Sequence, residues 1–366
     1  MQIKIDANEM SRALRALDSF IGSTTNSTSN SLRMYSENGS LRLERNDYET
    51  IVSYDTGIPV PDIAGTYIPA ALTGSILRSV TGKVTMEIRD KLVSFGHQRG
   101  QFTVKRLAEV DWPKPEPIEM TPLVVNSGVF ARALSQVEVS ISTDKYRLNL
   151  SGAHVSSEDE YIILSSTDSY RMSQVAVPGT VNFTGILPGS VVHGLTGYLS
   201  GEDDLAIDIG VDKLSAQIVA GRLSVTTRLV NASFPDFTTV IAKAEENDNL
   251  IVVNRKDFVR VLRQATLLFD KEKPRASISV ATNDDNEAEI SVGSFSDLGE
   301  AENCVYGVVK DGGSFSISVN PAYLVAGLEH FDSEVVRFSS SGNGKGVCVL
   351  TSDSDEFMYL FMPYNS

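Results

Sequence analysis

The sequence predicts an α+β protein built from three copies of one domain. The segment Gln101–Pro113, QFTVKRLAEVDWP, alternates like a strand and then stops at an aromatic residue followed by proline. Ser224–Phe237 repeats this pattern, including an Arg-Leu pair, and Phe357–Pro363 gives a weaker third version. Because proline cannot donate to a sheet ladder, each strand must end there. Each segment is therefore interpreted as the last strand of a unit that contains two helices and antiparallel sheets.

Length and composition fit several globular domains. The chain has 366 residues, whereas a single hydrophobic core stops growing near about 250–300 residues. No apolar run approaches the ~18 residues of a membrane span, and the first residues lack the apolar region of a signal peptide. Cys304 and Cys348 are too few for a disulfide framework. We therefore expect a cytoplasmic protein with reduced thiols and no membrane association.

The net charge of −15 argues against ordinary nucleic-acid binding, which normally uses a basic domain. The basic residues are nevertheless concentrated on or beside predicted helices, whereas the acidic residues cluster in loops. The helix-associated basic residues are Arg12, Arg15, Arg78, Lys83, Arg132, Arg255, Lys256, Arg260 and Arg263. An acidic protein with its basic helices on one wall can still face DNA.

Domain one, residues 1–120, is expected to begin with a strand and an amphipathic helix. Met10, Leu14 and Leu17 recur at helical spacing. Asn38-Gly39 between two alternating segments is a hairpin signal. The expected elements are the strand Gln2–Asp6, the helix Asn8–Phe20, the strands Leu32–Tyr35 and Leu41–Arg45, the helix Ala70–Val80, and the strands Val84–Ile88, Leu92–Phe95 and Phe102–Leu107.

Domains two and three, residues 121–246 and 247–366, repeat this order. Their helices recur roughly every 120–130 residues, far above the ~20–50 of solenoid repeats. In domain two we expect the strands Leu123–Asn126, Tyr161–Ser165, Arg171–Val177, Leu205–Ile209 and Leu214–Ile218, and the helices Ser127–Val139 and Pro188–Leu199. In domain three we expect the strands Leu250–Val253, Val335–Phe338 and Val347–Leu350, and the helices Lys256–Phe269 and Pro321–Phe331.

No motif in the sequence indicates catalysis, a metal or a cofactor. The four histidines have no metal-ligand spacing. Gly342–Gly346 lacks the residues of a phosphate loop and is interpreted as a hairpin turn. Asp284–Glu289 lacks the central glycine of a calcium loop and is interpreted as a solvated loop. Because no nucleophile–histidine arrangement is found either, we expect a protein that is not an enzyme and has no cofactor.

Several motifs, taken in order, resemble the bacterial DNA polymerase III beta subunit family, the sliding clamps. These motifs are Asn46-Asp47-Tyr48-Glu49, Thr167-Asp168-Ser169-Tyr170-Arg171-Met172, Arg228-Leu229 with Phe234-Pro235-Asp236-Phe237, Gly299-Glu300-Ala301-Glu302, Asn320 with Tyr323, and Met362-Pro363. Each motif is weak by itself. Their order on three similar domains is specific, and the resemblance covers essentially the whole chain.

The resemblance implies the DNA clamp fold and a ring-forming homodimer that encircles duplex DNA for processive synthesis. The implied partners are double-stranded DNA, bound without sequence preference, the DNA polymerase III alpha subunit, the clamp loader complex, and other polymerases and repair proteins with clamp-binding motifs. The implied DNA-facing residues are Arg12, Arg15, Arg78, Lys83, Arg132, Arg260 and Arg263. The implied dimer contacts are Gln101, Phe102, Leu268 and Phe269.

The resemblance also implies a pocket for partner peptides between domains two and three. Its implied lining is Arg147, Leu150, Thr167, Tyr170, Arg171, Met172, Pro235, Thr239, Val240, Asn320, Tyr323, Met362 and Pro363. Methionines suit such a pocket because they repack around different side chains. Tyr170 stands where the family usually has histidine, and Thr239 where it has arginine. The preferred partner motif is therefore expected to differ.

Two other classes of protein remain as alternatives. A β-rich structural or interaction protein built of three repeated domains predicts secretion, which the missing signal peptide does not favour. An enzyme predicts a convergent polar pocket, and the motifs do not assemble one.

Overall fold

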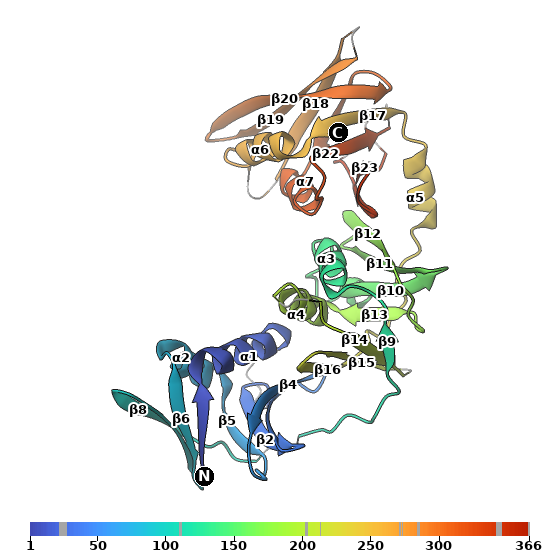
Figure 1. Cartoon of the computed structure of the whole chain (residues 1–366). Helices are drawn as coiled ribbons and strands as arrows, with labels where there is room; N and C mark the ends of the chain where they lie inside the picture. Colours follow the sequence, from blue (N-terminus) through green and yellow to red (C-terminus); the bar gives the residue numbers. More distant parts are fainter. Residues whose placement is uncertain are drawn as a thin grey trace. The chain divides into compact units, whose positions relative to one another are not determined.

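The computed structural model describes residues 1–21, 28–109, 112–201, 204–212, 214–270, 272, 274–283, 286–341 and 346–364. The chain divides into two compact units. Unit 1 comprises Met1–Leu134 and Gly179–Asn231, and unit 2 comprises Ser135–Pro178 and Ala232–Ser366. Figure 1 gives the labels of the helices and strands along the chain.

One order of elements occurs three times: strand, helix, four strands, helix, three strands. The first repeat consists of β1 (Gln2–Asp6), α1 (Ala7–Phe20), β2 (Ser31–Glu37), β3 (Ser40–Asn46), β4 (Thr50–Pro59), β5 (Thr66–Pro69), α2 (Ala70–Ser79), β6 (Lys83–Ile88), β7 (Leu92–His97) and β8 (Gly100–Lys105). The second consists of β9 (Thr121–Leu123), α3 (Ser127–Glu138), β10 (Gly152–Glu158), β11 (Tyr161–Thr167), β12 (Arg171–Pro178), β13 (Gly185–Pro188), α4 (Gly189–Leu199), β14 (Ile207–Val211), β15 (Ser215–Ala220) and β16 (Leu223–Arg228). The third consists of β17 (Asn249–Asn254), α6 (Arg255–Ala265), β18 (Ala276–Thr282), β19 (Glu287–Ser296), β20 (Gly299–Asp311), β21 (Phe315–Val319), α7 (Pro321–Leu328), β22 (Val335–Ser340), β23 (Cys348–Thr351) and β24 (Phe357–Phe361).

This order confirms the predicted α+β class with three repeats. Two short elements fall outside it: the 3₁₀ turn η1 (Leu148–Leu150) in the second repeat, and α5 (Thr238–Glu245) between the second and third. Residues 342–345 of the predicted turn Gly342–Gly346, and residues 284 and 285 of the predicted loop Asp284–Glu289, lie outside the described residues.

The ends of the elements follow local hydrogen bonding. Asp6 caps α1 by accepting from the N–H groups of Asn8 and Glu9 at 2.9 and 3.2 Å. In the β2–β3 hairpin, Asn38 and Gly39 have φ of 53° and 77°, as a tight turn between twisted strands requires. At these two places a local sequence signal is therefore enough to predict where the helix begins and where the hairpin turns.

Several predicted boundaries are wrong. The helix predicted to Phe269 ends at Ala265, and the Thr266 hydroxyl donates to the Arg263 carbonyl at 2.7 Å. The helix predicted to Phe331 ends at Leu328. The strand predicted as Leu123–Asn126 is Thr121–Leu123, because the Asn126 side chain caps α3 by accepting from the Val129 N–H at 3.1 Å.

The two Arg-Leu pairs do not occupy equivalent places. Leu92 is paired with Lys105, and Ser215 with Arg228, at the same end of equivalent hairpins. The structural equivalent of Arg228 is therefore Lys105. The sequence pattern had matched Arg228 with Arg106, which is one residue further along the chain.

Unit 1 contains two antiparallel sheets. One has the strand order β1-β6-β7-β8, and the other β5-β2-β3-β4-β16-β15-β14-β9. In the second sheet β4 pairs with β16, which joins the first repeat to the second, and the buried hydroxyls of Thr50 and Thr227 are 3.0 Å apart. Helix α1 packs against α2 and α4 (Figure 1). Its buried face, with Leu14, Leu17 and Phe20, supplies core between these helices and the sheet.

Unit 2 contains one long antiparallel run of strands, β10-β11-β12-β24-β23-β22-β17-β20-β19-β18-β21. Here β12 pairs with β24, from Arg171 opposite Phe361 to Val175 opposite Phe357. Helices α6 and α7 pack together, and α6 covers β19 and β20 (Figure 1). The Phe338 ring lies 6.1 Å from the centroids of Phe258 and Phe361, so aromatic residues fill this core.

The two junctions between repeats are equivalent. In each, the third strand after the first helix pairs with the last strand of the next repeat. Beyond the last residue pair of each ladder there is an equivalent main-chain hydrogen bond. The Arg228 N–H donates to the Glu49 carbonyl at 2.9 Å, and the Met362 N–H donates to the Tyr170 carbonyl at 2.8 Å.

Two strand edges lack the equivalent partner among the described residues. Strand β8 is the last in its sheet. In β20, residues 299–306 pair only with β19, because β17 reaches only residues 307–311.

A glycine sets the closest approach between α1 and α4. A Cβ atom on Gly194 would lie 2.5 Å from the Phe20 ring, and that ring is fully buried. We expect Gly194→Ala to lower the free energy of unfolding by about 1–3 kcal/mol, because the core there has no room for a methyl group. Gly197→Ala on the same helix is the matched control, since its Cβ would meet nothing within 4 Å. Chemical denaturation followed by circular dichroism measures both, and equal stabilities would contradict this packing.

Candidate functional site

A small cavity of about 110 Å³ lies in unit 2 where β12 meets β24. Six residues of the predicted peptide pocket line it: Thr167, Tyr170, Arg171, Met172, Val240 and Met362. Five lining residues were not predicted: Ser169, Phe237, Val347, Leu360 and Phe361. The strand junction therefore brings together residues that are far apart in sequence.

The turn between β11 and β12 forms one side of the cavity. The Asp168 carboxylate accepts from the N–H groups of Tyr170 and Arg171 at 2.9 and 3.0 Å. Ser169 adopts φ of 80°, a left-handed conformation that is uncommon for residues other than glycine. This turn leaves the Tyr170 side chain 57% exposed at the rim.

Met362 forms the opposite side. Its N–H donates to the Tyr170 carbonyl, so it lies directly beyond the last pair of the β12–β24 ladder. Its side chain is 47% exposed, whereas the next residue, Pro363, is buried. Two exposed apolar side chains, Tyr170 and Met362, thus face solvent at one opening.

Helix α5 forms the third wall, and sequence analysis missed it. Phe234-Pro235 ends the preceding extended segment, and the Asp236 carboxylate accepts from the N–H and hydroxyl of Thr238 at 2.9 and 2.6 Å. The helix buries one stripe against Met172, Val349 and Leu360; the stripe consists of Phe237, Val240, Ile241 and Ala244. Their i, i+3, i+4, i+7 spacing is the signal that could have predicted this helix.

Arg171 supplies a fixed positive charge at the polar end. Its Nε donates to Asp168 at 2.9 Å, and its guanidinium carbon lies 4.4 Å from the centroid of the Tyr323 ring. Burial lowers the pKa of Arg171, but the neighbouring Tyr359 and Asp168 outweigh burial and raise its pKa. Arg171 is therefore charged throughout the accessible pH range.

The other predicted pocket residues do not line this cavity. Arg147 donates to the Ser169 hydroxyl at the turn, and Asn320 caps α7 by accepting from the Ala322 N–H at 3.0 Å. Leu150 is buried in η1. Pro235 precedes α5, Thr239 is exposed on that helix, Tyr323 stacks on Arg171, and Pro363 follows Met362.

The predicted DNA-facing residues are mostly exposed. Arg12 and Arg15 lie on the solvent side of α1, Arg78 ends α2, Lys83 begins β6, and Arg132 is half-buried on α3. In unit 2, Arg260 pairs with Asp257 at 3.2 Å, and Arg263 pairs with Glu329. Helices α4 and α7 contain no lysine or arginine, so the positive charge is unevenly distributed among the helices.

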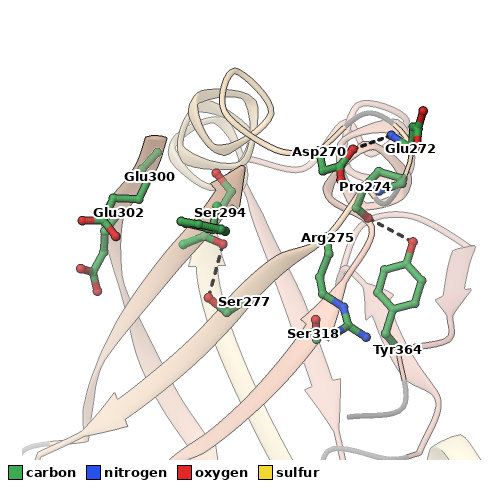
Figure 2. Close-up of a pocket in the computed structure, with 13 residues that line it drawn as sticks. Asp270, Glu272, Pro274, Arg275, Ser277, Ser294, Glu300, Glu302, Ser318 and Tyr364 are labelled. Carbon is green, nitrogen blue, oxygen red and sulfur yellow. Dashed lines mark hydrogen bonds between the residues drawn. The ribbon is translucent and has the colours of Figure 1, made fainter. Parts of the chain in front are cut away.

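A larger cavity, about 1130 Å³, lies elsewhere in unit 2, beside the first half of β20. Figure 2 shows Glu300 and Glu302 on one side and Arg275 with Tyr364 on the other. The Tyr364 hydroxyl donates to the Pro274 carbonyl at 3.0 Å, and the Arg275 guanidinium carbon lies 5.1 Å from the Tyr364 ring centroid.

The predicted dimer residues lie near strand edges or beside this cavity. Leu268 and Phe269 are half-buried immediately before Asp270, which lines the cavity. Gln101 and Phe102 lie on β8, and the Phe102 side chain is 38% exposed. Another cavity, about 650 Å³ in volume, lies where β7 begins and β8 ends. Its basic lining residues are Lys91, Lys105 and Arg106.

Within the described residues, no group of three or more histidine, cysteine, aspartate or glutamate side chains could hold a metal ion. No helix in this part of the chain is both long and apolar enough to cross a membrane.

Comparison with known proteins gives matches along the whole chain. Residues 124–236 match the central domain of the DNA polymerase III beta subunit, and residues 242–365 match its C-terminal domain. The beta sliding clamp of Streptomyces coelicolor is 24% identical over 353 residues, covering 91% of this chain and 90% of its own. That of Staphylococcus epidermidis is 23% identical over 316 residues, covering 84% and 81%.

Solved structures share the fold. A sliding clamp from Bartonella birtlesii bound to griselimycin has a TM-score of 0.88 at 20% identity, covering 100% of both chains. A DNA polymerase III beta subunit from Thermotoga maritima has a TM-score of 0.87 at 15% identity, covering 100% of this chain and 99% of its own.

Proposed function

Since the chain belongs to the family of DNA polymerase III beta subunits, we propose that two copies of it close into a ring around duplex DNA. Its function is that of a DNA sliding clamp for polymerase processivity, which is a non-catalytic role. The proposed modules of the ring are residues 1–120, 121–246 and 247–366. We place the protein in the cytoplasm, where the DNA and the polymerase are.

The observation that supports a ring most strongly is the pair of open strand edges. Within one chain, the pairing of β4 with β16 is repeated by β12 with β24. By the same rule β20 of one copy would pair with β8 of another. Each copy has one edge of each kind, so two copies can pair both β8 edges with both β20 edges.

The chemistry of the two edges is complementary. Val104 and Val305 are buried on the core faces of their sheets, so Lys105 lies on the outer face of β8, and Glu300 and Glu302 lie on the outer face of β20. Pairing that keeps the two core faces continuous brings Lys105 near these carboxylates. It also covers Phe102, which lies on the same face as Val104.

The DNA contacts are proposed to be weak and independent of sequence. Phosphate contacts carry no base information, and Asp257 and Glu329 partly neutralise Arg260 and Arg263. A closed ring needs little intrinsic affinity, because DNA is held topologically. We propose contacts from the predicted set, Arg12, Arg15, Arg78, Lys83, Arg132, Arg260 and Arg263. Because the sequence contains no nucleotide-binding motif, a separate ATP-driven clamp loader is expected to open the ring.

The cavity between β12 and β24 is the proposed docking site for partner peptides. Its apolar walls would hold the leucine and phenylalanine of a motif resembling Gln-Leu-Ser/Asp-Leu-Phe, carried by the polymerase alpha subunit, the clamp loader and repair proteins. Burying two such side chains contributes roughly 3–6 kcal/mol. After the ordering cost of a flexible peptide, affinity near ~1 μM is expected, which allows partners to exchange.

Reversing one charge on the β20 edge tests the ring. Glu300→Lys would place like charges beside Lys105 at both interfaces of the dimer, so we expect a dissociation constant about tenfold higher. Sedimentation velocity over a concentration series measures this, with Glu158→Lys, exposed on β10, as the control. Adding Lys105→Glu to Glu300→Lys should restore association. A double variant as weak as Glu300→Lys alone would place the interface elsewhere.

Truncating one pocket side chain tests the docking site. Met362→Ala removes an exposed apolar wall, and we expect at least tenfold weaker binding of a labelled motif peptide, with the dimer unchanged. Fluorescence anisotropy measures the peptide, and Tyr161→Ala, exposed on β11 outside the cavity, is the matched control. Unchanged binding by Met362→Ala would show that partners dock at another place.

A further inference from the structure

Unit 1 contains a groove of about 670 Å³ on the outer face of its eight-stranded sheet. The groove crosses β2, β3, β4, β16 and β15, and the segment 113–115 forms one wall. None of its lining residues belongs to the predicted site. Its position relative to the strand junction is the basis for the inference that follows.

This groove occupies the place in the first junction that the docking cavity occupies in the second. Ile51 is paired with Thr226 across β4 and β16, and Met172 is paired with Leu360 across β12 and β24. Both pairs line their respective hollows. In each case the segment that follows an aromatic residue and a proline supplies a wall: Pro115 in the groove, and Phe237 in the docking cavity.

The wall of the groove is fixed to the sheet. The Trp112 indole N–H donates to the Glu44 carboxylate, and the Trp112 ring centroid lies 5.5 Å from that of Tyr67. Glu44 also accepts from Arg33 at 2.8 Å, and the Arg33 guanidinium lies 4.3 Å from the centroid of the Tyr35 ring. The groove is therefore formed before any ligand arrives, which lowers the cost of binding an extended segment.

The lining of the groove differs chemically from that of the docking cavity. Polar side chains of Ser53, Ser224 and Thr226 stand on its floor, where Met172 and Leu360 line the other site. Hydrogen-bonding groups on both rims can hold the backbone of a strand-like peptide. An apolar motif would leave these groups unsatisfied, so the occupant must be polar.

The charges that line the groove determine which sign of charge the ligand should carry. Each carboxylate is already held by an arginine: Glu44 by Arg33, and Glu37 and Asp55 by Arg42 at 3.2 and 3.4 Å. Lys114 and Arg222 form no salt bridge within the described residues. Arg222 donates to the main-chain carbonyl of Thr56 at 3.2 Å, and its positive charge also acts on the nearby Asp55 carboxylate. The two cations without a salt bridge therefore favour an anionic partner, although the chain as a whole is strongly acidic.

We propose that this groove binds an extended acidic segment of a partner protein, as a second docking site on the same clamp. Its assignment as a docking site rests on the proposed function of the cavity between β12 and β24. The ligand chemistry rests on the groove itself. A partner that engages both sites would gain affinity through a raised effective concentration, without tighter binding at either site.

A labelled peptide of alternating glutamate and threonine is the probe, and fluorescence anisotropy at low salt is the measurement. We expect saturable binding to the full chain and about tenfold weaker binding by the Lys114→Ala, Arg222→Ala double variant. Lys4→Ala, exposed on β1 outside the groove, is the matched control and should bind like the unmodified chain.

Further arms separate the possible outcomes. Met362→Ala should leave binding of the acidic probe unchanged while weakening the motif peptide, so failure of one site is distinguishable from failure of the other. Absence of binding, or equal loss in Lys4→Ala and the double variant, would overturn the proposal. Displacement of the probe by single-stranded DNA at lower concentration than by unlabelled acidic peptide would also overturn it, in favour of nucleic acid.

Discussion

Strand pairing between repeats is the constraint on which this structure depends. A strand with a free edge exposes backbone groups that must find partners, and each repeat contributes two such strands, the third strand after its first helix and its last strand. Four of these six edges pair within the chain, at β4–β16 and β12–β24. The remaining edges, on β8 and β20, have no partner of this kind in the described chain. In the proposed dimer a second copy supplies both partners, so the same kind of strand pairing would account for the fold and for the ring.

The two junctions also form the cavity and the groove that we propose as docking sites. At β12–β24 the ladder ends between Tyr170 and Met362, and the chain segment that leaves β16 folds into α5 beside them. At β4–β16 the equivalent segment, residues 112–120, is proline-rich and forms neither helix nor strand, so it places no helix against the outer face of these strands. One geometry thus gives an apolar cavity in one place and a polar groove in the other. The difference lies in the linkers and in the side chains on the outer strand faces.

Sequence patterns predict the repeats well because their signals are local. Asn38-Gly39 requires left-handed backbone, and Asp6 caps its helix by itself. Sequence patterns predict less where tertiary contacts determine the local structure. The helix after Asn254 stops at Ala265 through a threonine side chain, and buried Arg45 is paired with Asp18 from another element. In the candidate site, the resemblance predicted Met172 and Met362, which line the cavity, whereas Val347 and Leu360 become lining residues only because β23 and β24 pair with their neighbours.

We propose that this protein holds DNA by topology. The most direct measurement is retention of the labelled protein, loaded by a bacterial clamp loader, on nicked circular duplex DNA during gel filtration at moderate salt. The account predicts that the protein stays with the circle and is lost once the same DNA is linearised, because phosphate contacts alone are weak and screened. Equal retention on linear and circular DNA would contradict it.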